Sequence, residues 1–476
     1  MTKQARGASA REPSDNGSWV AGEIAGCKFQ DARLGKRLGS LLQILSDGIG
    51  RTVPTACQDW ANTKAAYRFF DNERVDEQTI LAGHFQATRE RVHVVGGPVL
   101  VLHDTTEFSY MRDKPELVGL SGGSVRQRGQ MTTGKRCGVL MHSSLVVTAG
   151  GLPLGLAAIK FWNRSERDGT PTAKKLEARR LPTQEKETFR WLQNLRQSSD
   201  LVAQPERCVH IGDRESDMYE LFCTAQELGT RFLVRSRFDR PTGQGDHKIS
   251  EDMAQVAVQG LHRIEYRGGR GEPCEALLEI KYGRLSVRAP RGKHELPSAL
   301  VLTVVHAQER DAPADRAPLQ WKLITNLPVE SASQAVEKID WYAMRWKIET
   351  FHKILKSGCK AEDSRLQTAE RLTNLISIYC IVSWRVFWMT MVNRAEPEAS
   401  ARLAFTEVEI EVLDKLRPGG RGTPGTLSHY LIKLARLGGY LARNNDPPPG
   451  ATVIWRGLVR LHDVVFGVQL ANRVCG

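Results

Sequence analysis

The sequence predicts a multidomain protein of mixed α/β class, and three observations lead to that expectation. The chain has 476 residues, more than one ordinary domain holds. Strand-like and helix-like segments alternate between about residues 96 and 239, as they do in an α/β sheet. Helical patterns lie on both sides of the strand-containing region, which also includes a stretch rich in Gly, Pro and Arg.

Residues 1–17 are polar and lack periodicity, which predicts a disordered tail. Residues 18–92 are expected to form a compact helical domain. Leucines at helical spacing predict a helix between Arg33 and Leu45, broken at 52–55; a second helix ends at 64–70, and a third begins near 72–76. Basic residues such as Arg33 and Arg37 stand between the leucines, so we expect a basic face.

Residues 93–239 contain the strands that end at two aspartates. The apolar run 99–103 predicts a buried strand before Asp104, and a second run at 207–211 precedes Asp213. In open α/β sheets, function collects at the carboxyl ends of strands, although an ordinary turn aspartate gives the same pattern. The other expected elements are strands at 139–147 and 155–162 around a hairpin at 149–153, helices at 172–197 and 218–228, and a strand at 232–235.

The second half of the chain divides into three expected segments. Residues 240–320 form a β-rich insertion, with strand-like pieces at 276–280, 285–288 and 300–305. Residues 321–365 supply a strand at 323–326 and one long helix from Ser331 to about Ser357. Helices dominate residues 366–476, with breaks at 417–425 and 444–450.

Charge and cysteine content narrow the class of protein. The formal net charge is +13, from 67 basic and 54 acidic residues, which favours nucleic acid first and an anionic membrane surface second. No apolar run of transmembrane length and no signal-type segment is evident, so we expect a cytoplasmic protein without a membrane partner. The nine cysteines include no C-x-x-C pair, which argues against a zinc site and a disulfide framework.

The expected long helix carries four polar residues on one face. Tyr342, Arg345, Glu349 and Lys356 stand at offsets 0, 3, 7 and 14 and fall within an arc of roughly 60°. A carboxylate among cations stays ionised and can bind a metal, while the cations can hold phosphate oxygens. A solvated face stabilised by i,i+4 pairs would have the same spacing.

These residues resemble those of a known family, the bacterial cut-and-paste DDE transposases of the insertion-sequence-four (Tn-five) type. The spacing Tyr342-x2-Arg345-x3-Glu349-x6-Lys356 resembles the signature helix of that group in full. The resemblance runs from about residue 19 to the end of the chain. It also includes Leu102–Thr106 at the first aspartate, His210–Asp217 with Phe232–Ser236 at the second, Lys64–Phe70 in the DNA-binding domain, and segments 435–441 and 455–461.

The resemblance implies a ribonuclease-H-like core, a mixed sheet flanked by helices and interrupted by the β-rich insertion. In such a core Asp104, Asp213 and Glu349 would be the catalytic and metal-binding triad. It would hold two Mg²⁺ ions, with Mn²⁺ as a substitute, because hard oxygen ligands and phosphates suit these cations. His103 is not expected to act as a general base, because strand neighbours point to opposite faces.

The resemblance also implies which side chains contact DNA. Tyr342, Arg345 and Lys356 would hold the backbone near the cut, and Trp321 would stack on a flipped base, although a core tryptophan at a strand start looks the same in sequence. The remaining expected contacts are Arg214 and Arg235 beside the strands, and Lys64, Arg68, Arg33 and Arg37 in the N-terminal domain.

The implied activity is DNA transposition. The enzyme would bind the inverted-repeat ends of its element, cleave them by hydrolysis and hairpin formation, and join the 3′ ends to target DNA. A homodimer would hold the two ends, with residues 366–476 at the dimer contact, in a bacterial cytoplasm and on the nucleoid when bound to DNA. Two alternatives stay open: a metal-dependent nuclease or resolvase without strand transfer, and a catalytically silent DNA-binding regulator.

Overall fold

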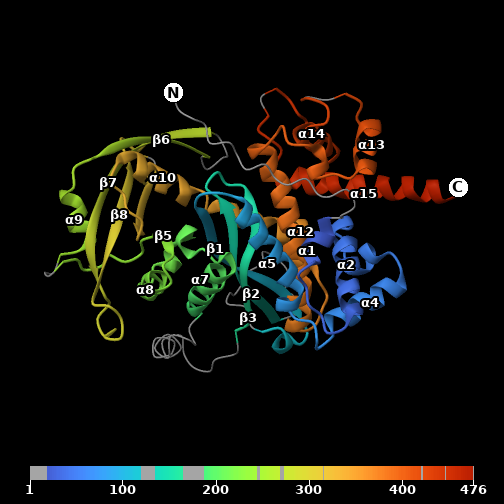
Figure 1. Cartoon of the computed structure of the whole chain (residues 1–476), viewed down its shortest axis with the longest axis horizontal. Coiled ribbons are helices and arrows are strands. Elements are labelled where there is room, and N and C mark those ends of the chain that lie inside the picture. The colour runs from blue at the N-terminus through green and yellow to red at the C-terminus, as the bar shows by residue number, and fades with distance from the viewer. Residues whose placement is uncertain are drawn as a thin grey trace.

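The computed structural model describes residues 19–119, 135–164, 187–243, 247–267, 273–314, 316–419, 422–444 and 446–474. The expected N-terminal tail and the first half of the helix expected at 172–197 lie outside these residues. The described part is mixed α/β, as predicted, with helices at both ends of the chain around one sheet (Figure 1).

The N-terminal region is helical, as expected. Its helices are α1 Trp19–Ile24, α2 Ala32–Asp47, α3 Val53–Cys57, α4 Trp60–Phe70 and α5 Glu77–Val94. Side chains of Asp31, Thr52, Asp59 and Asp76 accept backbone N–H groups at the starts of α2 to α5, which satisfies donors that a helix leaves free. The break expected at 52–55 is therefore the start of a short helix.

Within the described residues, nine strands form one sheet in the order β3-β2-β1-β4-β5-β9-β8-β7-β6. β1 is parallel to β4 and β4 to β5, and the other neighbours are antiparallel. The strands are β1 Val99–Arg112, β2 Lys135–Thr148, β3 Pro153–Trp162, β4 Cys208–Gly212, β5 Arg231–Arg235, β6 Gly260–Arg267, β7 Pro273–Arg288, β8 Ala299–Glu309 and β9 Gln320–Thr325.

The strands expected in the insertion continue the core sheet. β9 pairs with β5 on one side and with β8 on the other, so it joins the first five strands to β6–β8. Figure 1 shows β6, β7 and β8 as a curved extension at the left, with α9 Ile249–Gln255 at its outer end and α10 Ala332–Ala343 against it.

The helix expected from Ser331 to about Ser357 is not continuous. It is divided into α10, α11 Trp346–Lys353 and a π-helical turn, η5 Ile354–Gly358. At the junction the backbone hydrogen bonds tighten, because Arg345 N–H donates to Tyr342 at 3.0 Å and Lys347 N–H to Met344 at 2.9 Å. The expectation of one regular face from residue 342 to 356 was therefore wrong in its geometry.

Helices cover the sheet and form the C-terminal part. They are α7 Phe189–Val202, α8 Tyr219–Glu227, α12 Ala369–Ala395, α13 Glu407–Leu416, α14 Leu427–Leu437 and α15 Ala451–Val474, with short turns η1 Pro115–Leu117, η3 Pro205–Arg207, η4 Arg214–Ser216, η6 Ala361–Asp363 and η7 Ala401–Leu403. α5 crosses in front of the sheet, and α12 runs between the sheet, the N-terminal helices and the C-terminal helices (Figure 1).

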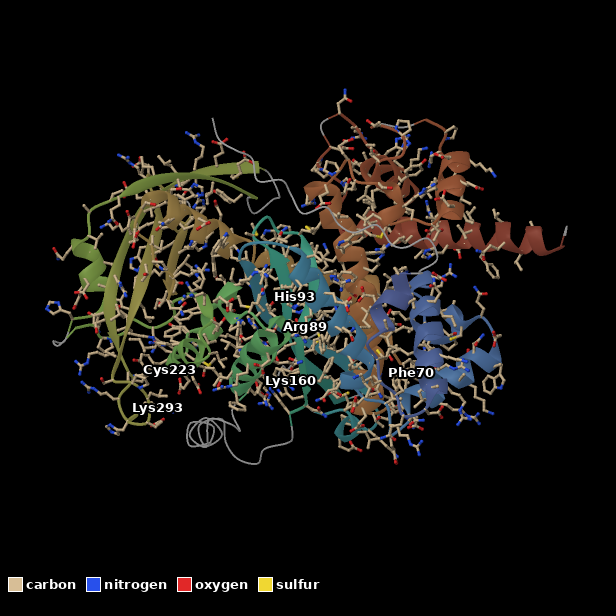
Figure 2. The ribbon with its side chains drawn as sticks, viewed as in Figure 1. Phe70, Arg89, His93, Lys160, Cys223 and Lys293 are labelled. Carbon is tan, nitrogen blue, oxygen red and sulfur yellow. The ribbon has the colours of Figure 1, made fainter. Side chains whose placement is uncertain are left out.

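Helix α12 is long and apolar enough to cross a membrane by length and composition. This corrects the expectation that no segment reaches such a length. However, 94% of its 18-residue apolar window is buried inside the protein, which is the behaviour of a central core helix. Phe70 lies where the N-terminal helices meet α12, and the amide of Asn374 donates to its backbone oxygen at 3.1 Å (Figure 2).

A buried polar cluster fixes the N-terminal helices to the sheet. Glu23 on α1 is 4% exposed and accepts from Arg91 Nη1 at 2.6 Å and from His84 Nδ1 at 2.5 Å. Leu156 N–H on β3 donates to His84 Nε2 at 3.0 Å, so the imidazole carries its proton on Nδ1. Burial opposes ionisation of Glu23, but His84 and Arg91 lower its pKa to about 2.

Candidate active site

The two aspartates follow paired positions of the neighbouring parallel strands β1 and β4, and Asp104 lies within β1 and not at its end as expected. The register pairs Leu102 of β1 with Ile211 of β4. Asp104 and Asp213 each come two residues after these partners, Asp104 still within β1 and Asp213 directly after the last residue of β4, Gly212. Asp104 belongs to β1, and Asp213 caps η4, where its Oδ1 accepts the backbone N–H of Glu215 at 2.8 Å.

Electrostatics show that the third carboxylate shares this region. Burial raises the pKa of the Asp213 carboxyl, and the negative charges of Asp104 and Glu349 raise it further, while the Glu215 N–H and Arg345 oppose the shift. Glu215 responds similarly: burial raises its pKa first, and then Asp213 and Asp104 do. Several carboxylates therefore repel one another here, which is the charge distribution that a bound cation relieves.

Glu349 is turned towards a cation of its own helix. Arg345 Nη2 donates to Glu349 Oε1 at 2.5 Å, and the Glu349 side chain is 54% exposed. Burial lowers the pKa of Arg345, but the bond to Glu349 outweighs burial and raises it overall. In the part of the chain that the structure describes, no three His, Cys, Asp or Glu side chains are close enough to hold an ion. The three carboxylates are thus near enough to influence one another's charge but not close enough to coordinate one ion together.

His352 connects the glutamate helix to the first aspartate, and the sequence interpretation missed it. Its Nε2 lies 2.8 Å from Ser143 Oγ, and its Nδ1 lies 3.6 Å from Asp104 Oδ2. Ser143 is the residue that β2 places directly across from Asp104. A signal was present, because residues three apart on a helix are neighbours and His352 follows Glu349 by three.

Three of the expected DNA contacts, Tyr342, Trp321 and Arg235, lie near one another. Tyr342 is buried; burial raises its pKa, which the positive charges of Arg345 and Arg235 oppose. The Trp321 ring centroid lies 6.4 Å from that of Tyr342, and Trp321 is partly buried. Arg235 donates to the backbone oxygen of Gln320 at 2.9 Å.

Of two other expected DNA contacts, Lys356 is engaged in a contact with β1 and Arg214 is exposed. Lys356 Nζ donates to the backbone oxygen of Glu107 at 2.6 Å and lies 5.5 Å from the Phe108 ring, so it holds the π-helical turn against β1. This contact lies three residues beyond Asp104 along the strand. Arg214 directly follows Asp213 and is exposed.

The four basic residues expected in the N-terminal domain lie on α2 and α4, on the far side of α12 from β1 (Figure 1). Arg33, Lys64 and Arg68 are exposed and Arg37 is half-buried. Two exposed aromatic residues on α4 were missed: Trp60 is 76% exposed and Tyr67 39%. Positions 60, 64, 67 and 68 share one helical face, so α4 presents two aromatic rings and two cations together.

Asp217 orients a nearby arginine and the loop that follows β5. It forms a buried ion pair with Arg240 at 2.6 Å and accepts the backbone N–H groups of Arg237 and Phe238 at 2.6 and 2.9 Å. The loop after β5 is thereby fixed beside η4, with Phe238 51% exposed.

His103 lies on the opposite side of β1 from the aspartates. Its ring bonds His210 and Ser144, each at 2.9 Å, and burial lowers its pKa to about 3. A hollow of about 790 Å³ lies elsewhere, between the N-terminal and C-terminal helices, and the triad residues are not among those described as lining it. Neither feature contributes to the carboxylate group.

Comparison with protein families gives two matches along the chain. The family described as transposase DNA-binding matches residues 16–75, which include α1 to α4. The family described as transposase DDE domain matches residues 96–385, more than half of the chain. The second match contains the sheet, its β6–β8 extension, and the positions of Asp104, Asp213 and Glu349.

Proposed function

The chain belongs to the DDE transposase family, and on that premise we propose that Asp104, Asp213 and Glu349 are its catalytic carboxylates. A DDE transposase binds DNA and is a metal-dependent enzyme that cuts and joins it. The proposal is supported by the pairing of Leu102 with Ile211, two residues before each aspartate, and by the packing of the Glu349 helix against the strand of Asp104. We further propose the insertion-sequence-four (Tn-five) type and a ribonuclease-H-like core formed by β1–β5.

The donor set fits hard divalent cations. Carboxylate oxygens are the ligands that Mg²⁺ and Mn²⁺ prefer, and burial, with the charges of Asp104 and Glu349, raises the pKa of the Asp213 carboxyl. Asp104, Asp213 and Glu349 would hold two Mg²⁺ ions, for which Mn²⁺ can substitute. When bound, the ions would stabilise the attacking and leaving oxygens of each phosphoryl transfer.

The cations around the triad would hold the DNA backbone. Arg345 contacts Glu349, Arg214 directly follows Asp213, and Arg235 lies near Tyr342, so all three could bind phosphate oxygens by charge-assisted hydrogen bonds. Tyr342 would fix Arg345, and Lys356 would hold the strand of Asp104 as well as a phosphate. Such contacts orient the scissile bond without reading sequence.

The proposed reaction sequence is a series of phosphoryl transfers at one site. Hydrolysis of one strand frees a 3′-hydroxyl, which attacks the opposite strand and closes a hairpin. A second hydrolysis reopens the hairpin, and the 3′ ends then attack target DNA. Hairpin closure needs an unstacked base, and the half-buried ring of Trp321 beside Tyr342 is a suitable surface for it.

DNA ends would be bound by the N-terminal helices. The exposed face of α4 carries Trp60, Lys64, Tyr67 and Arg68, a combination that contacts both phosphates and bases, and Arg33 and Arg37 of α2 would add phosphate contacts. The protein would act in the bacterial cytoplasm, where the chromosome lies.

A homodimer would hold the two ends through residues 366–476. The last turns of α15 project from the C-terminal helices (Figure 1) and expose Phe466 at 48% and Leu470 at 44%. Exposed apolar side chains on a projecting helix fit contact with a second copy of the chain.

The test is cleavage of a duplex that carries the terminal sequences of the encoding element. Asp104→Asn, Asp213→Asn and Glu349→Gln should each abolish nicking in Mg²⁺ while end binding stays within a few-fold, and Asp113→Asn, an exposed residue just beyond β1, should cut normally. Normal cutting by the triad variants would refute the assignment. Cleavage without a joined product would favour the nuclease, and binding without cleavage by the unaltered chain would favour the regulator.

A further inference from the structure

Each carboxylate of the proposed site has a different neighbour. Asp213 accepts a backbone N–H, from Glu215. Glu349 is paired with the guanidinium of Arg345. Asp104 faces an imidazole, that of His352, across 3.6 Å. The first two neighbours are common partners for a carboxylate, whereas a buried histidine shared between a helix and two strands is a specific construction.

The surroundings of His352 determine how its ring is oriented. The residue is 6% exposed, and Nε2 lies 2.8 Å from the hydroxyl of Ser143, which is fully buried. A carboxylate attracts an N–H group and repels a nitrogen lone pair, so the tautomer with the proton on Nδ1, the nitrogen that faces Asp104, is favoured. In the neutral ring Nε2 then accepts from Ser143 Oγ. The distance from Nδ1 to Oδ2 is longer than a hydrogen bond, so this contact is electrostatic.

We propose that His352 is a positioning residue for Asp104 in metal binding. Its Nδ1–H would attract Oδ2 and leave the other carboxylate oxygen available to a cation. Because His352 and Glu349 are on the same helix, the imidazole also sets the distance between the strand of the first carboxylate and the helix of the third. This inference rests on the proposed function, in which Asp104 is a metal ligand.

Partners that orient metal-ligating carboxylates have a measurable effect. Losing such a partner typically weakens metal binding by about 10- to 100-fold. A purely structural role for His352 would depend on Nε2 and Ser143, which dock α11 on β2. A positioning role depends on Nδ1 and Asp104. The two roles therefore assign the important contact to different nitrogens of one ring.

Two amide substitutions separate the nitrogens. In His352→Asn the amide nitrogen takes about the place of Nδ1, so the donor towards Asp104 is kept and the Ser143 contact is lost. In His352→Gln the amide takes about the place of Nε2, so the Ser143 contact is kept and the donor is lost. Mn²⁺ is titrated into each full-length variant, free Mn²⁺ is followed by electron paramagnetic resonance, and thermal unfolding is recorded alongside.

We expect His352→Gln to weaken Mn²⁺ binding by about 10- to 100-fold and His352→Asn to stay within about threefold of the unaltered chain. Equal losses in both variants, or a larger loss in His352→Asn, would overturn the proposal, as would unchanged binding in His352→Gln. If His352→Gln does not fold, Ser143→Ala provides the test in its place, because it removes the hydroxyl that orients the ring. Binding should then weaken at least about threefold, and unchanged binding would count against the proposal.

The same titration distinguishes this inference from the proposed function. Asp104→Ala and Asp213→Ala should remove the Mn²⁺ binding that belongs to the site. If they do not, the assignment of the carboxylates fails. If they do while His352→Gln binds as the unaltered chain does, the carboxylates stand and the role of His352 alone fails.

Discussion

Replacing Glu23 by Gln tests how firmly the N-terminal helices are held on the catalytic sheet. The pKa of Glu23 falls from an ordinary 4.5 to about 2, because His84 and Arg91 outweigh the effect of burial. At about 1.4 kcal/mol per pH unit, the charged carboxylate is favoured by about 3 kcal/mol over the neutral group in this environment. Glutamine has nearly the same shape but no charge, so the variant should lose an amount of this order.

The loss should be local and should depend on pH. Hydrogen exchange measured by mass spectrometry at pH 7 should show α1 and α5 opening about 100-fold more often in Glu23→Gln, with little change in β6–β8. A carboxyl whose pKa is lowered stabilises the fold above its unfolded value of 4.5, and the contribution is lost as pH falls towards 2. The difference between the two chains should therefore shrink below pH 4.5.

A matched control is available on the same helix as His84. Glu90 on α5 is exposed, and Glu90→Gln should leave exchange in α1 and α5 unchanged. The reasoning would be refuted if Glu23→Gln exchanged at the rate of the unaltered chain, or if Glu90→Gln accelerated exchange as much. Either result would mean that the buried charge does not hold the helices to β3.

The remaining predictions concern three other contacts. His462 lies 3.4 Å from both Asp47 and Glu409, and although burial lowers its pKa, these carboxylates raise it overall. The charged ring therefore stabilises the fold below pH 6.5, and this stability is lost as pH rises through the raised pKa. The melting temperature should fall over that pH range, and His462→Gln should make it less dependent on pH. Trp60→Ala should weaken end binding by about fivefold in a gel-shift assay, since a lost aromatic contact is worth about 1 kcal/mol, and should leave the melting temperature unchanged because the ring is exposed. Arg345→Gln should tighten Mn²⁺ binding to the DNA-free protein about twofold, because a part-exposed pair contributes about 0.5 kcal/mol, yet should slow DNA cleavage.

The strands that carry or precede the two aspartates were predictable because a buried strand has a local pattern in the sequence. Apolar runs before Asp104 and Asp213 predicted two buried strands, and both are present as β1 and β4. The extent of β1 was underestimated, because beyond Asp104 the strand continues with half-buried polar residues and loses the continuous apolar pattern. The pairing of β1 with β4 is set by tertiary packing across more than a hundred residues, which periodicity does not report.

Two other differences have equally physical origins. The helix expected as one piece contains a tightened turn at Arg345 and a π-helical turn after Lys353, and neither changes the amino-acid pattern enough to be seen. The apolar helix α12 is buried on nearly every side, so its composition resembles a membrane span while its packing is that of a core. The contacts of His352 are with residues more than 200 positions earlier in the chain, so its role is not visible in the local pattern.

The pair formed by Arg345 and Glu349 makes DNA binding and metal binding interdependent. In the proposed function the guanidinium of Arg345 has two alternative partners, the Glu349 carboxylate that it contacts in this structure and a phosphate of the DNA. When it turns to phosphate, Glu349 loses its counter-ion and adds uncompensated charge beside Asp213, whose pKa it already raises. A cation then binds more tightly, and by linkage the bound cation strengthens the phosphate contact by the same factor. For a part-exposed pair worth about 0.5 kcal/mol this factor would be about two, and Arg345→Gln should therefore move metal binding and cleavage in opposite directions.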